Sequence, residues 1–245
     1  MNNLKLDACI AQHQGDRKEQ QDRLALVGHS SLPGVALAVV ADGMGGHTGG
    51  ALAAEQVVHT LSTDFLQWRG EDAQSMIREA CFEAHAMIKI SRFINEKDPH
   101  STVIALVLQK KRVFWGYCGD SRLYAFRGDE LRTRTIDHSW VEHLVRQGKL
   151  TPQEAEHHPN KNVLITSLGG AEAPHLDFGR LDDLQEGDSF LLCSDGLWAY
   201  FDVQELGRII QAGRAREVAD KLIRMARVRA AGKGDNLSLA LLKFH

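Results

Sequence analysis

The residues best suited to chemistry in this sequence are aspartates at the ends of short apolar runs. Asp42 follows VALAVVA, Asp120 follows VFWGYCG and Asp195 follows FLLCS. Asp22 directly precedes RLALVG, and Asp235 opens the final run DNLSLALL. Four of the five have a glycine beside them. A single Asp-Gly pair is ordinary turn chemistry, so the information lies in the repetition.

Two of these aspartates are expected to face each other. The runs 23–28 and 35–41 are separated by the turn-rich segment HSSLPG, which predicts an antiparallel hairpin. Asp22 and Asp42 then lie at its open end, where opposed residues have Cβ atoms about 4.5–5.5 Å apart. Two carboxylates so close repel each other unless a cation lies between them. If the other strands bring Asp195 and Asp235 to the same place, the carboxylates converge in one cleft.

A carboxylate cluster without nearby Cys or His selects hard cations. Carboxylate, carbonyl and water oxygens suit Mg²⁺ and Mn²⁺ better than Zn²⁺. The adjoining glycines let backbone carbonyls approach an ion without steric obstruction. Two cations about 3.5–4 Å apart would activate a water and neutralise the oxygens of an in-line displacement. The sequence therefore predicts a site for two Mn²⁺ or Mg²⁺ ions.

The elements that must position these aspartates come as groups of strands separated by helices. Apolar patterns predict strands over 4–11, 23–28, 35–41, 102–109, 112–118, 122–127, 189–194 and 236–243, with a short strand after Gly128-Asp129. Helical spacing predicts helices across 54–65, 73–88, 203–211 and 214–230, and 137–158 is expected to be helical and polar. This order favours an α+β fold with antiparallel sheets, in one domain over residues 1–245.

Composition excludes several classes of protein. The net charge of -3 provides no general basic surface, so no nucleic-acid partner is expected, and Arg224, Arg227 and Arg229 are interpreted as a solvated helix face. Neither a signal-peptide core nor a membrane-spanning apolar run occurs. Four cysteines without C-x-x-C spacing indicate a reducing compartment and no structural disulfide. We expect a cytoplasmic protein without a membrane partner.

Six stretches together resemble one known family. They are GDRKEQQDR (15–23), VVADGMGGHTGG (39–50), GYCGDSRLY (116–124), DHSWVEHLVRQGKLT (137–151), LLCSDGLW (191–198) and GDNLSLALL (234–242). Their order and approximate spacing are similar to those of the PPM family, the PP2C-type metal-dependent serine/threonine protein phosphatases, over nearly the whole chain. The resemblance implies a four-layer α-β-β-α sandwich, in which two antiparallel sheets lie between outer helices.

The resemblance also implies roles for the carboxylates. Asp42 matches the residue that bridges both cations, and Gly43 would offer its backbone carbonyl. Asp195 and Asp235 match ligands of one cation. Asp22 matches the acidic position that holds metal-bound water.

Four further positions take implied roles. Asp120 matches the aspartate that helps to bind a third, weaker cation in bacterial members. Arg17 lies five residues before Asp22, where the family keeps an arginine that grips substrate phosphate. A planar guanidinium suits this task because it can bind two phosphate oxygens at once. Asn236 resembles the family's Asp-Asn pair, and Gln21 stands where the family often has Glu.

Some positions depart from the family pattern. Gln21 adds no charge, so the first metal is expected to bind more weakly. Met44 replaces a histidine that some eukaryotic members carry as the proposed general acid, and His47 is the nearest alternative donor. The polar segment 137–170 corresponds to the family's flap beside the active site, which is thought to influence substrate choice. It contains His157, His158 and Lys161.

The function implied is hydrolysis of phosphoserine or phosphothreonine in proteins by a metal-activated water. Phosphorylated proteins would be the substrates, a bacterial Ser/Thr kinase would be the opposing enzyme, and we expect a monomer. The alternative is a catalytically weak, PPM-like regulator that binds phosphoproteins, which Gln21 and Met44 favour and the retained carboxylates oppose.

Two unrelated classes have weaker support. A serine hydrolase would need G-x-S-x-G, which LCSDG (192–196) and GHSSL (28–32) only approach. A nucleotide-binding loop would need Gly-Lys-Ser/Thr, or a third glycine where GMGGHTGG has Thr48.

Overall fold

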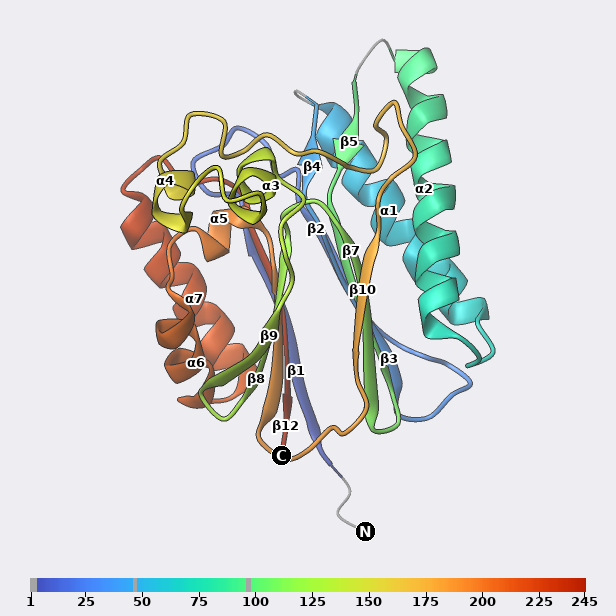
Figure 1. Cartoon of the computed structure of the whole chain (residues 1–245). Helices are drawn as coiled ribbons and strands as arrows, with labels where there is room; N and C mark the ends of the chain where they lie inside the picture. The colour runs from blue at the N-terminus through green and yellow to red at the C-terminus, as the bar shows by residue number, and fades with distance from the viewer. Residues whose placement is uncertain (1–3, 46–47, 96–97) are drawn as a thin grey trace.

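The computed structural model describes residues 4–45, 48–95 and 98–245 and contains two five-stranded antiparallel sheets that face each other (Figure 1). The first sheet has the order β1 (Leu6–His13), β12 (Leu237–Phe244), β11 (Asp188–Cys193), β8 (Arg122–Arg127) and β9 (Glu130–Arg134). The second has the order β10 (Asp177–Leu181), β7 (Arg112–Cys118), β6 (Val103–Gln109), β3 (Val35–Ala41) and β2 (Arg23–Gly28).

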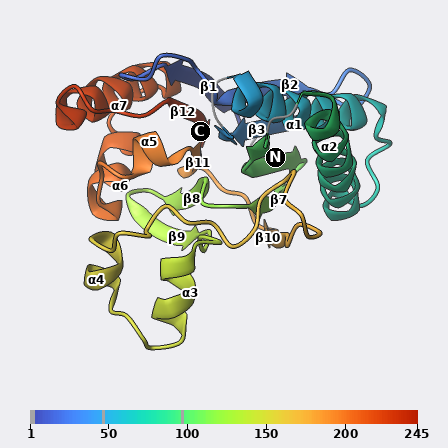
Figure 2. The same cartoon turned by 90° about the horizontal axis from the view of Figure 1, so that it is seen from above.

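Helices cover both outer faces of the sheet pair, as the view from above shows (Figure 2). The long helices α1 (Thr48–Gln67) and α2 (Ala73–Asn95) pack on the second sheet, and α6 (Val203–Gln211) and α7 (Ala215–Ala230) pack on the first. The predicted α+β, four-layer α-β-β-α sandwich is therefore confirmed. No helix in the described ranges is long and apolar enough to cross a bilayer.

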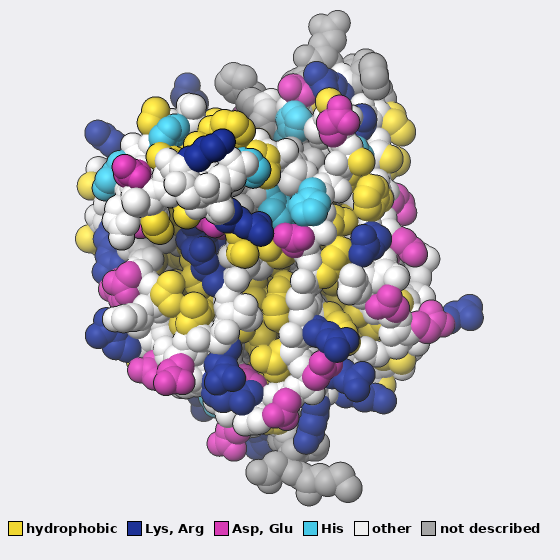
Figure 3. Space-filling view, in the orientation of Figure 1, with side chains coloured by type: hydrophobic (Ala, Val, Ile, Leu, Met, Phe, Trp, Pro, Cys, Tyr) yellow, Lys and Arg dark blue, Asp and Glu magenta, His cyan; other side chains and the backbone are white. Residues whose placement is uncertain are grey.

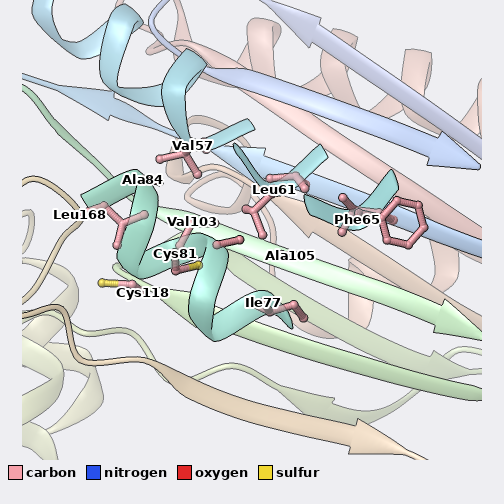
Figure 4. Close-up of a cluster of buried hydrophobic side chains, with 14 of the residues drawn as sticks. Val57, Leu61, Phe65, Ile77, Cys81, Ala84, Val103, Ala105, Cys118 and Leu168 are labelled. Carbon is pink, nitrogen blue, oxygen red and sulfur yellow. The ribbon is translucent and has the colours of Figure 1, made fainter. Parts of the chain in front are cut away.

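The central strands are buried on both faces. In β3, Leu37 and Val39 contact the outer helices, whereas Ala38 and Val40 lie in the core between the sheets. Figure 4 shows the outer core, where Leu61 of α1 lies against the second sheet. Because both faces of β3 pack against apolar layers, its sequence VALAVVA is apolar throughout instead of alternating.

The hairpin that positions the first two aspartates has the predicted register. Strands β2 and β3 pair antiparallel, and the pair nearest to the open end joins Arg23 to Ala41. Asp22 and Asp42 are the next residues along each strand. The prediction that they face each other at this end is confirmed. A two-stranded ribbon, β4 (Gly43–Met44) with β5 (His100–Ser101), continues the chain beyond β3.

The prediction of one helical stretch over 137–158 is wrong. The segment forms two short helices, α3 (Trp140–Arg146) and α4 (Pro152–Glu156). Gly148 separates them with a φ of +68°, a left-handed conformation that ends a helix. Thr151 then caps α4 in a capping box with Glu154, and Pro152 occupies the first turn.

The two long helices extend beyond their predicted ranges, since α1 begins six residues before residue 54 and α2 ends seven residues after residue 88. Most other differences from the predicted elements are small or concern short elements. The predicted strands 4–11, 102–109, 189–194 and 236–243 are shifted by at most two residues. The sequence did not indicate β4, β5, β10 or the single-turn helix α5 (Asp195–Trp198). Strand β10 was missed because it is a half-exposed edge strand that contains a glycine, so its apolar pattern is weak.

We expect the core between the sheets to dominate stability. Phe190 of β11 is buried there and meets Phe244 edge-to-face, with ring centroids 6.1 Å apart. Phe190→Ala should lower the free energy of unfolding by about 3–5 kcal/mol, because it leaves a cavity in close-packed surroundings. Urea denaturation measures this loss. Val228→Ala is the control, since Val228 is 79% exposed and its loss should cost less than about 0.5 kcal/mol. Equal losses for the two variants would contradict this packing.

Candidate metal and phosphate site

A cleft of about 510 Å³ opens at the end of the sheets where β4 lies (Figure 1). Eight of the nine predicted site residues line it: Arg17, Gln21, Asp42, Gly43, Asp120, Asp195, Asp235 and Asn236. They come from segments far apart in the sequence. The lining also includes Lys18, Glu19, Met44, Gly45, Asn162 and Leu164, none of which was predicted as a site residue.

Backbone and hydroxyl contacts hold Asp42 where β3 ends. Its N–H donates to Oγ1 of Thr102 (3.0 Å), and its carbonyl accepts from the N–H of Thr102 (2.9 Å) and the hydroxyl of Ser101 (3.1 Å). The Thr102 hydroxyl also contacts that of Ser121 (2.8 Å), which follows Asp120. The hydroxyls of Thr102 and Ser121 therefore link the two loops that carry Asp42 and Asp120.

The residue after Asp42 must be a glycine, because there is no room for a side chain at position 43. A Cβ at Gly43 would lie 2.0 Å from the carbonyl oxygen of Gly50 at the start of α1. The close approach places the start of α1 against the loop after Asp42.

Asn236 ties the loop of Asp235 to the segment that carries Arg17. Its Oδ1 accepts from the N–H of Gln21 (2.7 Å), and its Nδ2 donates to the carbonyls of Gln14 (2.7 Å) and Glu19 (2.9 Å). Its own N–H donates to Oδ1 of Asp235 (2.8 Å). With its side-chain amide engaged in this way, Asn236 positions the loop and leaves the carboxylates to bind ions.

Asp22 lies beneath the cleft lining and is the most buried of the predicted carboxylates. It is 1% exposed, and its Oδ2 accepts a hydrogen bond from Ser194 (2.8 Å). Within the described residues its Oδ1 has no hydrogen-bond partner. A buried carboxylate oxygen without a donor is costly unless a cation or water satisfies it.

Burial and mutual repulsion raise the pKa values of four aspartates. Among the effects that raise each pKa, burial is the largest and the neighbouring negative charges come next. The pKa is raised to about 7 for Asp22, about 8 for Asp120 and about 6 for Asp195, and that of Asp42 lies well above its usual range. Asp235 is among the charges that raise the pKa of Asp22, Asp42 and Asp195. The five carboxylates therefore form one electrostatic group.

The donor set fits hard divalent cations. All the side-chain ligands that line the cleft offer oxygen, and no Cys or His is among its described lining residues. Cations between the carboxylates would offset the repulsion that raises their pKa values.

Arg17 lies on the rim and faces the carboxylates. Its side chain is 63% exposed, and Nη2 contacts Oδ2 of Asp235 at 2.5 Å. The hydrogen bond and charge of Asp235 raise the pKa of Arg17, and the charges of Asp195 and Asp42 act in the same direction. A guanidinium in this place can contact an anion that enters the cleft.

Comparison with known proteins agrees with this geometry. Residues 11–232 match the family profile described as Protein phosphatase 2C. The chain belongs to the protein phosphatase 2C family. Protein phosphatase PhpP of Streptococcus pneumoniae is 33% identical over 222 residues, which cover 86% of this chain and 87% of that protein.

Solved structures of this family share the architecture. The catalytic domain of the serine/threonine protein phosphatase PstP, in complex with two manganese ions, has a TM-score of 0.84 and 27% identity over 99% of both chains. PppA of Pseudomonas aeruginosa, described as a key regulatory component of T6SS, has a TM-score of 0.80 and 28% identity, covering 99% of this chain and 100% of that chain.

A cation–π stack supports the Asp120 loop of this protein phosphatase 2C fold. Trp198 of α5 donates through Nε1 to the carbonyl of Asp120 (2.9 Å), and the guanidinium of Arg122 lies 3.4 Å from the Trp198 ring centroid. Arg122 also forms a bidentate pair with Asp137 (2.8 and 2.6 Å), where the flap begins. Sequence reasoning missed this support, although GDSR, DGLW and DHS are parts of the motifs that carry the family resemblance.

Two residues of the segment 137–170 reach the cleft. Asn162 and Leu164 line the cleft, whereas His157, His158 and Lys161 do not. Met44 lines the cleft and has no proton to donate. His47 lies outside the described residues.

A separate group of His138, His175 and Asp177 brings possible ligand atoms within 4.8 Å of one another. In Figure 3 histidines gather beside an acidic side chain on this face. The N–H of Gly119 donates to Nδ1 of His138 (3.2 Å), and Nε2 of His138 lies 3.3 Å from Asp177. Because Nδ1 accepts from Gly119, the proton of the neutral ring belongs on Nε2, and burial lowers the pKa of His138, which favours the neutral ring. Both ring nitrogens of His138 therefore have hydrogen-bond partners within the protein.

The serine hydrolase alternative fails on geometry. Ser194, the serine of LCSDG, is fully buried, and its hydroxyl donates to Asp22 and accepts from the N–H of Ser238 (3.0 Å). A nucleophile needs access to substrate and a base to activate it. Ser194 has the role of a support for Asp22.

The carboxylate group predicts an unusual pH dependence of stability without metal. An unfolded aspartate has a pKa near 3.8, and the folded values of Asp195, Asp22 and Asp120 are about 6, 7 and 8. Between these pH values the folded state binds more protons than the unfolded state, so stability falls as pH rises. Urea denaturation in EDTA should give a lower free energy of unfolding at pH 8 than at pH 5.

Two controls accompany this measurement. Mn²⁺ should restore stability at pH 8 because it binds only the folded site. Asp22→Asn should reduce the pH dependence, since the amide has no proton to lose in this pH range. A metal-free protein that is as stable at pH 8 as at pH 5 would contradict the convergence of these carboxylates.

Proposed function

We propose that this chain hydrolyses phosphoserine and phosphothreonine in proteins with two Mn²⁺ or Mg²⁺ ions held in the cleft. The observation that carries the proposal is the convergence of five buried or half-buried aspartates below a rim that carries Arg17. It is a metal-dependent serine/threonine protein phosphatase of the protein phosphatase 2C family.

Some of the proposed residues would contact the ions directly, and Asp22 would act through a water. Asp42 would hold both ions and Gly43 would offer its backbone carbonyl, and Asp195 and Asp235 would be ligands of one ion. Asp22 would act from beneath through a water, and Asp120 would help to hold a third ion. When bound, the ions supply Lewis acidity, which activates a water and neutralises charge on the phosphoryl oxygens.

The other residues bind and orient the substrate. Arg17 would contact two phosphoryl oxygens and so stabilise charge in the transition state, as phosphoryl transfer requires. Gln21 lines the cleft and would contribute an uncharged polar group. Asn236 holds the Arg17 segment and the Asp235 loop together. Met44 cannot protonate the leaving oxygen, so the proton would come from water.

The relatives support an active phosphatase over the alternative of a catalytically weak regulator that binds phosphoproteins. Protein phosphatase PhpP and the serine/threonine phosphatase stp of Listeria welshimeri match 86% and 84% of this chain. A binding module without ions would have no need to bury mutually repelling carboxylates, and all five remain. The substitutions Gln21 and Met44 leave this group intact.

We further propose the surroundings in which the enzyme acts. Residues 1–245 would form one catalytic domain, a monomer, with residues 137–170 as a flap beside the cleft. Four free thiols are consistent with a cytoplasmic location. The opposing enzyme would be a bacterial Ser/Thr kinase, and the likeness to PppA supports a test of kinases linked to type VI secretion.

The decisive experiment is Mn²⁺-dependent release of phosphate from phosphoserine, phosphothreonine and phosphotyrosine peptides. Asp42→Asn should lower kcat/KM on the phosphothreonine peptide at least about 1,000-fold, because the central ligand to both ions is lost. EDTA should remove activity from the wild type.

The control is Asp129→Asn, an equivalent change at an exposed aspartate in the β8–β9 turn, outside the cleft lining. It should keep wild-type kinetics. Wild-type turnover by Asp42→Asn would show that the assignment of this residue is wrong.

Arg17→Ala tests phosphate binding separately from metal binding. The loss of its charge-assisted contact with phosphate, which contributes about 1.5–3 kcal/mol in total, should raise KM about 10- to 100-fold. The fall in kcat should be smaller. Arg208→Ala, at an exposed arginine of α6, provides the control for loss of a positive charge. An unchanged KM for Arg17→Ala would exclude Arg17 from substrate binding.

A further inference from the structure

A bidentate ion pair joins α7 to the segment that carries Arg17. Arg227, in the last turn of α7, donates from Nη1 to Oδ2 and from Nη2 to Oδ1 of Asp16, both at 2.7 Å. Asp16 directly precedes Arg17. From the sequence alone Arg227 is expected to face solvent, and the structure instead places its guanidinium on this carboxylate, with 25% of the side chain exposed.

The same carboxylate also binds the loop of Asp235. Oδ2 of Asp16 accepts from the N–H of Gly234 (2.7 Å), and the N–H of Asp16 donates to the Gly234 carbonyl (2.9 Å). Hydrogen bonds from Arg227 and Gly234 lower the pKa of Asp16 to about 2, so the group stays ionised. Asp16 thus connects the segment that carries Arg17 to α7 and to Gly234, the residue before Asp235.

The Gly234 loop packs tightly against α7. A Cβ on Gly234 would lie 2.8 Å from Nη1 of Arg227 and 2.9 Å from Cβ of Ala230. The loop therefore lies directly against α7, and the ion pair covers it.

We infer that Arg227 and Asp16 are positioning residues, which orient Arg17 toward substrate phosphate and fix Asp235 for its ion. The inference rests on the proposed function. The Arg17 side chain is 63% exposed, so packing does little to set its direction, which depends on its contact with Asp235 and on the backbone beside it. Asn236 holds this segment at Gln14, Glu19 and Gln21, and Gln14 donates to the carbonyl of Arg17 (2.8 Å). Asp16 fixes the residue directly before Arg17 to α7.

A purely structural role predicts something different. Exposed ion pairs contribute little to the free energy of unfolding, whereas a bidentate pair sets orientation strongly. Removing a purely structural pair would thus change stability, substrate binding and metal binding very little. Removing a positioning pair would weaken substrate and metal binding.

The chain contains a matched control two residues further along α7. Arg229 also forms a bidentate pair, with Glu205 of α6 (2.7 and 2.5 Å), and donates to the carbonyl of Tyr200. Its exposure of 36% is similar. Neither Glu205 nor Tyr200 lines the cleft.

The experiment compares Arg227→Gln with Arg229→Gln. For Arg227→Gln we expect KM on the phosphothreonine peptide to rise about tenfold with kcat changed less than about twofold, because misplaced contacts weaken binding. Calorimetry should show weaker Mn²⁺ binding, and amide hydrogen exchange should increase over residues 14–18. Arg229→Gln should leave KM and Mn²⁺ binding unchanged and increase exchange over residues 200–206. Arg227→Lys should recover only part of the loss, since an ammonium is not bidentate.

Equal KM, Mn²⁺ affinity and exchange in the two glutamine variants would overturn the inference. If Arg227→Gln does not fold, Asp16→Asn is judged by the same three measurements. If the wild type releases no phosphate from any peptide, the proposed function fails, while Mn²⁺ binding and exchange still decide whether Arg227 positions these loops.

Discussion

Repulsion among buried carboxylates is the constraint on which the rest of this molecule depends. Burial and neighbouring charge raise the pKa values of Asp22, Asp42, Asp120 and Asp195, so the folded chain without cations holds these groups at a cost in stability. The hydrophobic layers must supply the stability that this arrangement removes. Three apolar cores, one under each helical layer and one between the sheets, do so.

The loops that carry these carboxylates are held from outside the cleft. Asp42 is fixed by Ser101 and Thr102, and the Asp120 loop by Trp198. Such supports use neutral hydrogen bonds or ion pairs directed away from the cleft, so they leave the carboxylate oxygens available. This division is typical of functional sites in which neighbouring residues orient the groups that act.

The two sheets contribute unequally to the cleft. β3 of the second sheet leads directly to Asp42, whereas Asp195 begins α5 after β11 and Asp235 lies in the loop before β12 of the first sheet. The cleft therefore depends on how the sheets face each other, and the core between them, which includes Phe190 and Phe244, holds that packing. From the segment 137–170, Asn162 and Leu164 line the cleft.

Local patterns in the sequence determined the long elements, the β2–β3 hairpin and the identity of the acidic residues, because apolar period and turn chemistry act over a few neighbours. They also determined that Asp22 and Asp42 face each other. Only the tertiary structure decided that β10 forms an edge and that Asp16 pairs with Arg227 across 211 residues. It also decided that Asp22 lies beneath the cleft and that Asn162 lines it. These features arise from contacts between distant segments, which no local pattern of residues encodes.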